Sequence, residues 1–438
     1  MIQGEEAERM EKAVVRTIML RLMPLLGLLY MVAYIDRQNI AYAKLQMVDD
    51  LGLSEAAYGL GAGLFFIGYC LFEIPSNIIL ERMGARVWFA RILGTWGLIT
   101  VALGFAWTPT SFYILRFLLG VAEAGFFPGV LYALTLWFPQ AYRARAVGTF
   151  MVASAFANAV GSAIGGALLT LDGLSGLRGW QWVFIATGIP ALLLVPVVLM
   201  VLPRGPAEAR WLNDAQKQWL AGVLAHEQTE KGIEQPLKAL GDRRVLLLAV
   251  TFLGFPLGAY GLSYWLPTIV KGFGVSDMAN GLLNIIPWLC VAAALWWYPQ
   301  YTSRRPDRAW YVAAPLVIGA VCLVIANIAP GAPLKFIALC IAAAAIFAGQ
   351  PGFWALPTRI LTGAGAAAGL AAINSVGNLG GFVAQSVVPR IRDETGSDLA
   401  PMLFLAICLV LTAIGVMLIA GRLIPSNVTV DDPGGKGA

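Results

Sequence analysis

Long apolar runs dominate the chain, and the polar segments between them are short. Twelve of these runs contain about 20 residues or more, enough for a helix to cross a hydrocarbon core of about 30 Å. We expect them near residues 18–44, 56–80, 87–107, 110–138, 146–170, 180–203, 245–270, 279–302, 309–329, 333–358, 366–390 and 401–422. The pattern predicts an all-α integral membrane protein with 12 transmembrane helices.

A single long polar segment, residues 204–244, divides the apolar runs into two sets of six. The predicted fold is therefore a pair of six-helix bundles. The expected parts are a cytoplasmic N-terminal segment 1–17, an N-terminal bundle 18–203, a cytoplasmic linker 204–244, a C-terminal bundle 245–422 and a cytoplasmic tail 423–438.

Two glycine-rich stretches indicate an internal repeat. Residues 161–166 in the fifth run and 377–381 in the eleventh are rich in small residues, and each follows a run that ends near a tryptophan and a proline. This favours a six-plus-six duplication, an arrangement in which a site lies at the interface of the two halves. The other interpretation is that small residues simply let helices approach closely in lipid.

Composition excludes several classes of protein. The chain is 59% hydrophobic and 13% charged, whereas soluble domains are about 45–50% apolar and about 25% charged. It is therefore neither a soluble globular protein, nor a nucleic-acid binder, nor a disordered chain. The five cysteines are scattered in apolar runs and the chain has one histidine. Because no metal or nucleophile–base constellation emerges, we expect no cofactor, no metal site and no enzymatic activity.

Lysine and arginine are biased toward one set of short loops. If the amino terminus is cytoplasmic, the inside loops hold most of these basic residues, including Arg82, Arg86 and Arg143. The positive-inside rule then places both termini and the long linker in the cytoplasm. Arg390 and Arg392 are exceptions, because they lie on the outside.

Five charged residues lie within the apolar runs, all in the first half: Asp36, Arg37, Glu73, Arg116 and Glu123. A charge at the middle of a bilayer costs at least about 2.5–3.5 kcal/mol, so such residues mark a site or a structural ion pair. The interior polar groups of the second half are neutral. The asymmetry predicts that the first half carries the charge chemistry and the second supplies neutral contacts.

Arg116 and Glu123 are two helical turns apart and share one face, about 10 Å from each other along the axis. An arginine stays ionised and presents a planar fork that fits a carboxylate. A buried glutamate can gain and lose a proton near neutral pH. We therefore expect an anion on Arg116 and a proton on Glu123. The alternative is that Arg116 pairs with a carboxylate only to hold helices together.

Asp36 and Arg37 point about 100° apart on a helix, so one can face the pathway while the other faces a neighbouring helix. Asp36 is a candidate proton carrier and Arg37 a candidate anion ligand, although both could belong to a structural salt-bridge network. Glu73 suits a gating or structural role. Tyr34, Tyr69 and Trp354 are candidate pathway residues that could equally serve in packing.

Several motifs identify a family. The stretch from Asn77 to Arg86, which contains Glu81, Arg82 and Gly84, resembles the loop motif of the major facilitator superfamily. The stretches 33–39, 65–69, 73–77, 116–129, 137–139 and 178–182 extend the match over nearly the whole chain. Together they resemble the anion:cation symporter family of that superfamily, in particular bacterial tartrate and phthalate permeases.

The resemblance implies proton-coupled uptake of organic anions across the inner membrane. In that family Asp36 and Glu123 correspond to the protonatable pair, and Arg116 to the residue at the substrate carboxylate. The other residues implied at the substrate are Arg37, Tyr34, Tyr69 and, from the second half, Asn374, with Trp354 added as a pathway candidate. The gating and loop-motif residues are Glu73, Glu81, Arg82 and Arg86.

The sequence thus predicts a proton-coupled symporter that imports a small organic carboxylate by alternating access. Tartrate-like or phthalate-like dicarboxylates are favoured, and sugar acids come next. One alternative is proton-coupled efflux of amphipathic compounds, although two arginines would obstruct a cation and the fifth run lacks the Gly-Pro of drug antiporters. Another is a receptor or scaffold with purely structural charges. The expected partners are the organic anion, protons rather than sodium, and the bilayer of the bacterial cytoplasmic membrane, with the protein as a monomer.

Overall fold

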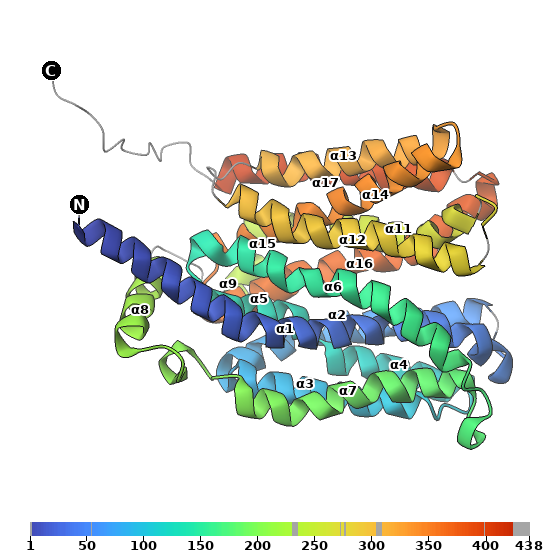
Figure 1. The fold of residues 1–438 in the computed structure, drawn as a ribbon, viewed down its shortest axis with the longest axis horizontal. Coiled ribbons are helices and arrows are strands. Elements are labelled where there is room, and N and C mark those ends of the chain that lie inside the picture. The colour runs from blue at the N-terminus through green and yellow to red at the C-terminus, as the bar shows by residue number, and fades with distance from the viewer. Residues whose placement is uncertain are drawn as a thin grey trace.

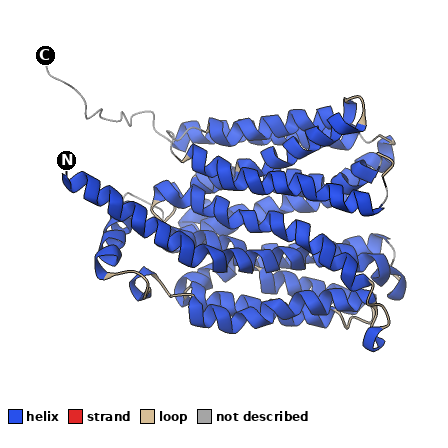
Figure 2. Cartoon of the chain, in the orientation of Figure 1, coloured by secondary structure: helices blue, strands red, loops and turns tan. Residues whose placement is uncertain are grey.

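Helices form all the regular structure of the described chain (Figure 2). The computed structural model describes residues 2–53, 55–229, 235–271, 273–275, 277–303, 309–397 and 399–423, and no β-strand is formed within these ranges. The predicted tail beyond residue 423 lies outside the described residues. The all-α prediction is confirmed.

Twelve helical stretches of the described chain are long and apolar enough to cross a membrane, as predicted. Those of the first half are α1 (Ile2–Asp50), α2 (Glu55–Met83), α3 (Ala85–Leu103), α4 (Pro109–Glu123) with α5 (Phe126–Trp137), α6 (Gln140–Leu169) and α7 (Gly179–Val201). Those of the second half are α10 (Arg243–Phe252) with α11 (Gly254–Lys271), α12 (Asp277–Thr302), α13 (Trp310–Ile328), α14 (Ala332–Ala348) with α15 (Gln350–Ala355), α16 (Gly363–Thr395) and α17 (Leu399–Leu423).

The helices form two bundles that lie side by side (Figure 1). Helices α1–α7 make one bundle and α10–α17 the other, and they meet chiefly where α2 packs against α16 and α6 against α12. Helix α1 begins, and α17 ends, at the same end of the molecule, where the linker helices α8 (Asp214–Thr229) and α9 (Pro236–Gly241) also lie. The first helix is longer than predicted, because it starts at Ile2 rather than near residue 18.

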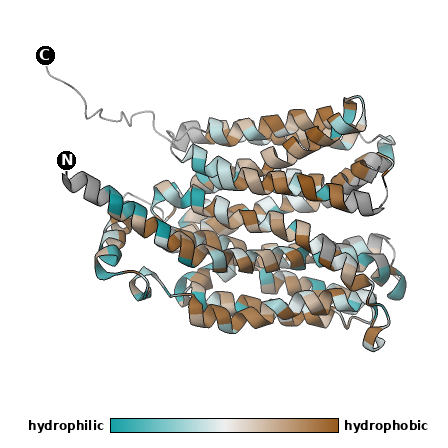
Figure 3. Cartoon of the chain, in the orientation of Figure 1, coloured by the Kyte–Doolittle hydropathy of each residue, from teal (hydrophilic) through white to brown (hydrophobic). Residues whose placement is uncertain are grey.

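The outer surface of the bundles is apolar. Hydrophobic residues cover the middle of the helices, while hydrophilic residues gather on α8 and near the start of α1 (Figure 3). Large aliphatic side chains such as Leu193, Ile328 and Leu418 are more than 60% exposed. An exposed apolar surface of this kind is stable only in contact with lipid.

The fourth span is broken in its middle, which the apolar run 110–138 did not predict. Helix α4 ends at Glu123, and Gly125 adopts a left-handed conformation with φ 89° before α5 begins. The Ser76 hydroxyl donates to the freed carbonyl of Ala124 at 2.6 Å and accepts from the Trp88 indole at 3.0 Å. Non-helical backbone is tolerated at membrane depth only where protein groups satisfy it in this way. The break sets Glu123 at a helix end.

The glycine-rich stretches pack helices closely. A side chain at Gly165 would meet Tyr42 of α1, and one at Gly377 would meet Phe252 of α10, each within 2.5 Å. A Cβ at Gly380 would lie 2.1 Å from the Leu253 carbonyl oxygen. Both stretches predicted as repeat elements therefore serve close helix contact.

Candidate functional site

Five charged side chains of the first bundle are buried in its interior or where it meets the second bundle. Asp36 and Arg37 come from α1, Glu73 from α2, and Arg116 and Glu123 from α4. Asp36 and Glu73 have no exposed surface, and Glu123 and Arg116 are only 1% and 4% exposed. Arg37 keeps 15% of its side chain exposed. All five predicted intramembrane charges are therefore buried or nearly so.

Glu123 forms an ion pair with Arg37, not with Arg116. The Nε of Arg37 donates to Oε2 of Glu123 at 2.9 Å. The other oxygen, Oε1, is buried and has no hydrogen-bond partner among the described residues. Spacing along the helix puts Arg116 about 10 Å from Glu123, too far for a direct bond. The packing of α1 brings Arg37 to Glu123, which the spacing did not indicate.

Arg116 is a buried cation without a hydrogen-bond acceptor in the described chain. Its guanidinium lies over the Phe65 ring, with Cζ 4.9 Å from the ring centroid, and its Nε makes no hydrogen bond. No carboxylate of the described residues comes within ion-pair distance of it. The charges of Glu123 and Asp36 still act on it through space. A buried guanidinium in this state offers N–H donors of the kind that carboxylates accept.

Aromatic rings surround the two arginines. The Arg37 guanidinium lies 5.0 Å from the Tyr69 ring centroid and 6.0 Å from that of Phe65. Tyr34 packs edge-on against Tyr30, with ring centroids 5.2 Å apart. The Tyr69 hydroxyl is buried and has no hydrogen-bond partner among the described residues. The predicted pathway residue Tyr69 thus lies against Arg37, and Tyr34 lies within the electrostatic reach of Arg37.

Trp354 joins the two bundles. Its ring lies 5.6 Å from Phe127 of α5 and 4.5 Å from Phe252 of α10, measured between centroids. It is 1% exposed, and its indole N–H has no acceptor among the described residues. An unsatisfied indole donor in a buried aromatic cluster is suited to an acceptor that arrives from outside.

Asp36 faces away from Arg37 and into the bundle. Its Oδ2 accepts from the Trp96 indole at 2.7 Å and the Thr100 hydroxyl at 3.0 Å, and its Oδ1 accepts from Asn39 at 2.9 Å. Asn39 also donates to Thr187 of α7 at 3.0 Å. The carboxyl therefore ties α1 to α3 directly and to α7 through Asn39. This matches the expectation that one residue of the Asp36–Arg37 pair faces a neighbouring helix.

Glu73 connects the two halves. The Asn374 amide donates to its Oε1, and the Ser375 hydroxyl donates to its Oε2, both from α16. Asn374 was expected to contribute from the second half, and it does reach the first half, but its partner is Glu73. Sequence reasoning missed Ser375; only its position next to Asn374 could have indicated it.

The loop-motif residues lie apart from this group. Glu81 and Arg82 are in the last turn of α2. Arg86 is in the first turn of α3 and donates to the Leu199 carbonyl of α7. They lie where α2 ends and α3 begins, beside the end of α7. A gating role for them would therefore involve contacts between helix ends, not contact with substrate.

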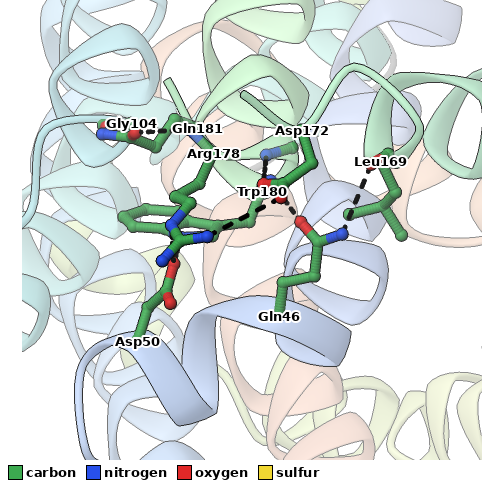
Figure 4. Close-up of polar contacts among 9 residues, drawn as sticks. Gln46, Asp50, Gly104, Leu169, Asp172, Arg178, Trp180 and Gln181 are labelled. Atoms are coloured by element: carbon green, nitrogen blue, oxygen red, sulfur yellow. Dashed lines mark hydrogen bonds and ion pairs between the residues drawn. The ribbon is translucent and has the colours of Figure 1, made fainter. Parts of the chain in front are cut away.

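The motif at 178–182 stabilises the opposite end of the first bundle (Figure 4). The Trp180 indole donates to Asp50 at 2.7 Å, and its backbone N–H donates to Gln46 at 3.1 Å, so the start of α7 is attached to the end of α1. Arg178 lies 3.4 Å from Asp50 and 3.7 Å from Asp172. This motif is structural.

A second polar cluster lies at the end that carries the linker. Glu227 of α8 accepts from the Gln140 backbone N–H at 2.8 Å and pairs with Arg143 at 2.7 Å. Arg143 also donates to the Thr358 carbonyl of the second half at 3.3 Å. A cavity of about 410 Å³ opens beside this cluster. Sequence reasoning missed the cluster, because nothing in the linker marked Glu227 among its other acidic residues.

The described residues contain no group of three or more histidine, cysteine or acidic side chains able to hold a metal ion. The central group instead combines two guanidiniums, one of them without an ion-pair partner in the described chain, with three buried carboxyls and aromatic walls. This arrangement is suited to binding an anion between two bundles. Two packed six-helix bundles with a charged site inside the membrane define a membrane transporter.

Comparison with known proteins gives the family. The family model described as Major Facilitator Superfamily matches residues 26–385, and the chain belongs to this superfamily. Its members are transporters and not enzymes, which agrees with the prediction from sequence. The resemblance to organic anion permeases is confirmed by relatives that are named as tartrate transporters.

Several relatives match over almost the whole chain. A protein of Acinetobacter baumannii named "Quinolone resistance transporter" is 45% identical over 94% of this chain and 96% of its own. A protein of Agrobacterium vitis named "Putative tartrate transporter" is 43% identical over 95% of this chain and 97% of its own. The Pseudomonas putida protein named "Putative metabolite transport protein NicT" is 40% identical over 94% of this chain and 96% of its own.

Solved structures share the fold. A proton:xylose symporter has a TM-score of 0.70 at 18% identity and covers 92% of this chain and 95% of that one. The fucose:proton symporter of E. coli has a TM-score of 0.67 at 14% identity, covering 91% and 99%. A human organic anion transporter also has a TM-score of 0.67, at 16% identity, covering 93% and 99%. At these identities the likeness concerns the fold alone.

Proposed function

We propose that this transporter imports a small organic carboxylate together with protons, by alternating access of a site between its two bundles. A tartrate-like or phthalate-like dicarboxylate is the favoured substrate, and a sugar acid comes next. Arg116 and Arg37 bind the carboxylate, Tyr34, Tyr69 and Trp354 line the site, and Asn374 contacts the substrate from the second half.

The observation that carries the proposal is the unpaired guanidinium of Arg116. Its Nε has no acceptor among the described residues, and no carboxylate pairs with it, although the side chain is 4% exposed. Burial of an uncompensated charge costs several kcal/mol, and a cost of this size favours a functional reason for keeping the charge. A substrate carboxylate would accept two parallel N–H bonds from the fork.

The Arg37–Glu123 pair supplies a route to proton coupling. While Glu123 is ionised, its 2.9 Å bond holds the Arg37 side chain. A proton on Glu123 removes that charge and releases Arg37 to bind the anion. Proton and anion therefore favour each other at this site, and loss of the proton on the other side returns Arg37 to Glu123 and expels the anion.

Asp36 is the second proton carrier in this proposal. It lies within electrostatic reach of Glu123 and Arg116, so its charge state changes the field at both. Its three hydrogen bonds connect that charge to the packing of α1 on α3. Protonation of Asp36 would weaken these bonds and loosen the contact between the two helices.

We further propose that the protein lies in the bacterial cytoplasmic membrane as a monomer, with residues 1–17, 204–244 and 423–438 in the cytoplasm. The arginine bias of the short loops supports this orientation. On this orientation Glu81, Arg82 and Arg86 lie at the cytoplasmic ends of their helices, where they act in gating.

The 45% identical relative named "Quinolone resistance transporter" favours a second candidate, the export of an amphipathic compound. Quinolones carry a carboxylate, which the unpaired Arg116 would accommodate. The two candidates differ in direction and in cargo. Two arginines in the site favour an anion over a cation in either case.

The test is uptake into proteoliposomes under an imposed pH gradient. Labelled tartrate, phthalate, benzoate, gluconate and a quinolone are compared, with Arg116→Met and Glu123→Gln as variants. We expect accumulation of one carboxylate that a protonophore abolishes and that neither variant supports. Uptake that persists without the gradient would contradict the proton-coupled proposal, and gradient-driven extrusion of the quinolone alone would favour the export candidate.

A further inference from the structure

We infer that Glu73 carries an additional proton through the transport cycle, and that this proton weakens its hold on Asn374 in favour of the substrate. The inference rests on the proposed proton-coupled uptake of a carboxylate and adds a third carboxyl to it.

Glu73 is fully buried between the two bundles. It has no exposed surface, and both its oxygens accept hydrogen bonds from α16, one from the Asn374 amide and one from the Ser375 hydroxyl. No cation of the described residues lies within ion-pair distance. The titratable and charged groups around it are Arg37 of α1 and Tyr69 and Cys70 of α2, and on α16 it meets the neutral Asn374 and Ser375.

The charges of the site do not balance. Two arginines face three carboxyls, Asp36, Glu73 and Glu123, so the fully ionised site has a net charge of 2 − 3 = −1. A substrate carboxylate makes this charge more negative still. Glu123 has the cation Arg37 and Asp36 has three neutral donors, whereas Glu73 has two neutral donors and no ion pair among the described residues. It is therefore the carboxyl for which a proton brings the largest relief as the anion enters.

The position of Glu73 gives its proton alternating access. Its hydrogen bonds cross from α2 of the first bundle to α16 of the second. Separation of the bundles at this level breaks both bonds and brings water to the carboxyl, and closure buries it again. A carboxyl that passes between water and a closed interface binds its proton with a different affinity in each state, which is the requirement for a coupled proton.

The proton on Glu73 also controls Asn374. An ionised Glu73 accepts the N–H of the Asn374 amide and the O–H of Ser375. When Glu73 is protonated on Oε2, its O–H donates to the Ser375 oxygen. The amide N–H of Asn374 is then held only by the neutral carbonyl oxygen Oε1, a weaker acceptor than a carboxylate, so a substrate carboxylate can take it over. The substrate and the ionised Glu73 therefore compete for the same donor, and the proton resolves the competition in favour of the substrate.

The first test measures the number of protons that move with each substrate molecule. The full-length protein is reconstituted in proteoliposomes, and the membrane potential that stops net tartrate flux is determined at a fixed pH gradient. We expect Glu73→Gln to carry one proton fewer per tartrate than the wild type. Glu227→Gln, the same change on the linker helix, is the matched control and keeps the wild-type ratio. An unchanged ratio in Glu73→Gln overturns the inference.

The second test needs no substrate. Infrared difference spectra of the reconstituted protein, taken while the pH is changed from acid to mildly alkaline, report the carbonyl stretch of protonated carboxyls. We expect one titrating band that is lost in Glu73→Gln and shifted in Ser375→Ala, which removes a donor and keeps the carboxyl. Identical spectra in all three proteins overturn the inference, even if Glu73→Gln does not transport. If the wild type moves no protons with any carboxylate while the band is present, the proposed function fails and the titration of Glu73 stands.

Discussion

The two arginines of the site differ in their partners, so replacing each of them should affect the stability of the protein differently. Arg37 is paired with Glu123 at 2.9 Å, whereas Arg116 has no ion-pair partner among the described residues. We predict that Arg37→Met destabilises the protein and that Arg116→Met does not, although both changes replace a guanidinium by an apolar chain of similar length.

The magnitudes follow from what each change leaves behind. Arg37→Met strands the Glu123 carboxylate, which is 1% exposed, and breaking a buried pair in this way costs about 3–5 kcal/mol. Arg116→Met loses a cation–π contact with Phe65 worth about 0.5–2 kcal/mol and removes an uncompensated buried charge. Its net effect should be close to zero or stabilising.

Arg116→Met should weaken substrate binding strongly, although it leaves the stability of the protein nearly unchanged. Two hydrogen bonds to a charged group are worth about 1.5–3 kcal/mol each, so their loss weakens carboxylate binding by roughly 100-fold or more. Thermal unfolding of the purified variants in one detergent, with binding of the transported acid measured in parallel, checks both expectations. An Arg116→Met protein that melts as early as Arg37→Met would refute the reasoning, because it would mean that Arg116 holds helices together.

Three further substitutions test other parts of the structure. Asp36→Asn places an amide N–H where a carboxylate oxygen now accepts a hydrogen bond, so one of the present donors loses its acceptor. The change should cost about 1–3 kcal/mol of stability, measured by thermal unfolding. Glu227→Ala removes the acceptor for Arg143 and for the first N–H of α6; it should lower the unfolding temperature and leave substrate affinity unchanged, and a change in affinity would argue against its place outside the site. Gly120→Ala puts a Cβ 2.0 Å from the Phe65 carbonyl oxygen, so α2 and α4 must separate, and the yield of folded protein in membranes should fall sharply compared with Gly222→Ala, where the added Cβ meets nothing.

The spans could be predicted from sequence because lipid imposes a simple requirement. Every backbone polar group inside a bilayer must be satisfied, so each apolar run of sufficient length forms a helix. The breaks in the fourth, seventh and tenth spans could not be predicted in the same way. At Ala124 the break depends on a hydroxyl from Ser76, which is 48 residues away in sequence. Such a contact exists only once the helices have packed.

The residues of the site could be predicted from the sequence, but the ion pairs among them could not. Charged residues in apolar runs stand out because of their cost, so Asp36, Arg37, Glu73, Arg116 and Glu123 were identified from their positions. Which of them pair depends on the rotation of each helix about its axis. A sequence pattern shows which residues share a helix face but not which neighbouring helix that face meets. The Arg37–Glu123 ion pair could therefore be identified only from the structure.

The contacts of Glu73 were the least predictable. They join α2 to α16 across 301 and 302 residues of sequence and depend on how the two bundles meet. The neutral character of the second half was predicted, and Asn374 was identified as its contribution. That its amide would be held by a carboxyl of the first half could not be deduced, because no local pattern records contacts between bundles.

The central claim is that a proton on Glu123 releases Arg37 to bind the anion. The most direct measurement counts the protons taken up when the purified transporter binds its carboxylate, by calorimetry in buffers of different ionisation enthalpy. We predict net proton uptake by the wild type and a smaller uptake, with binding retained, in Glu123→Gln. Anion binding without proton uptake in the wild type, or equal uptake in Glu123→Gln, would contradict it.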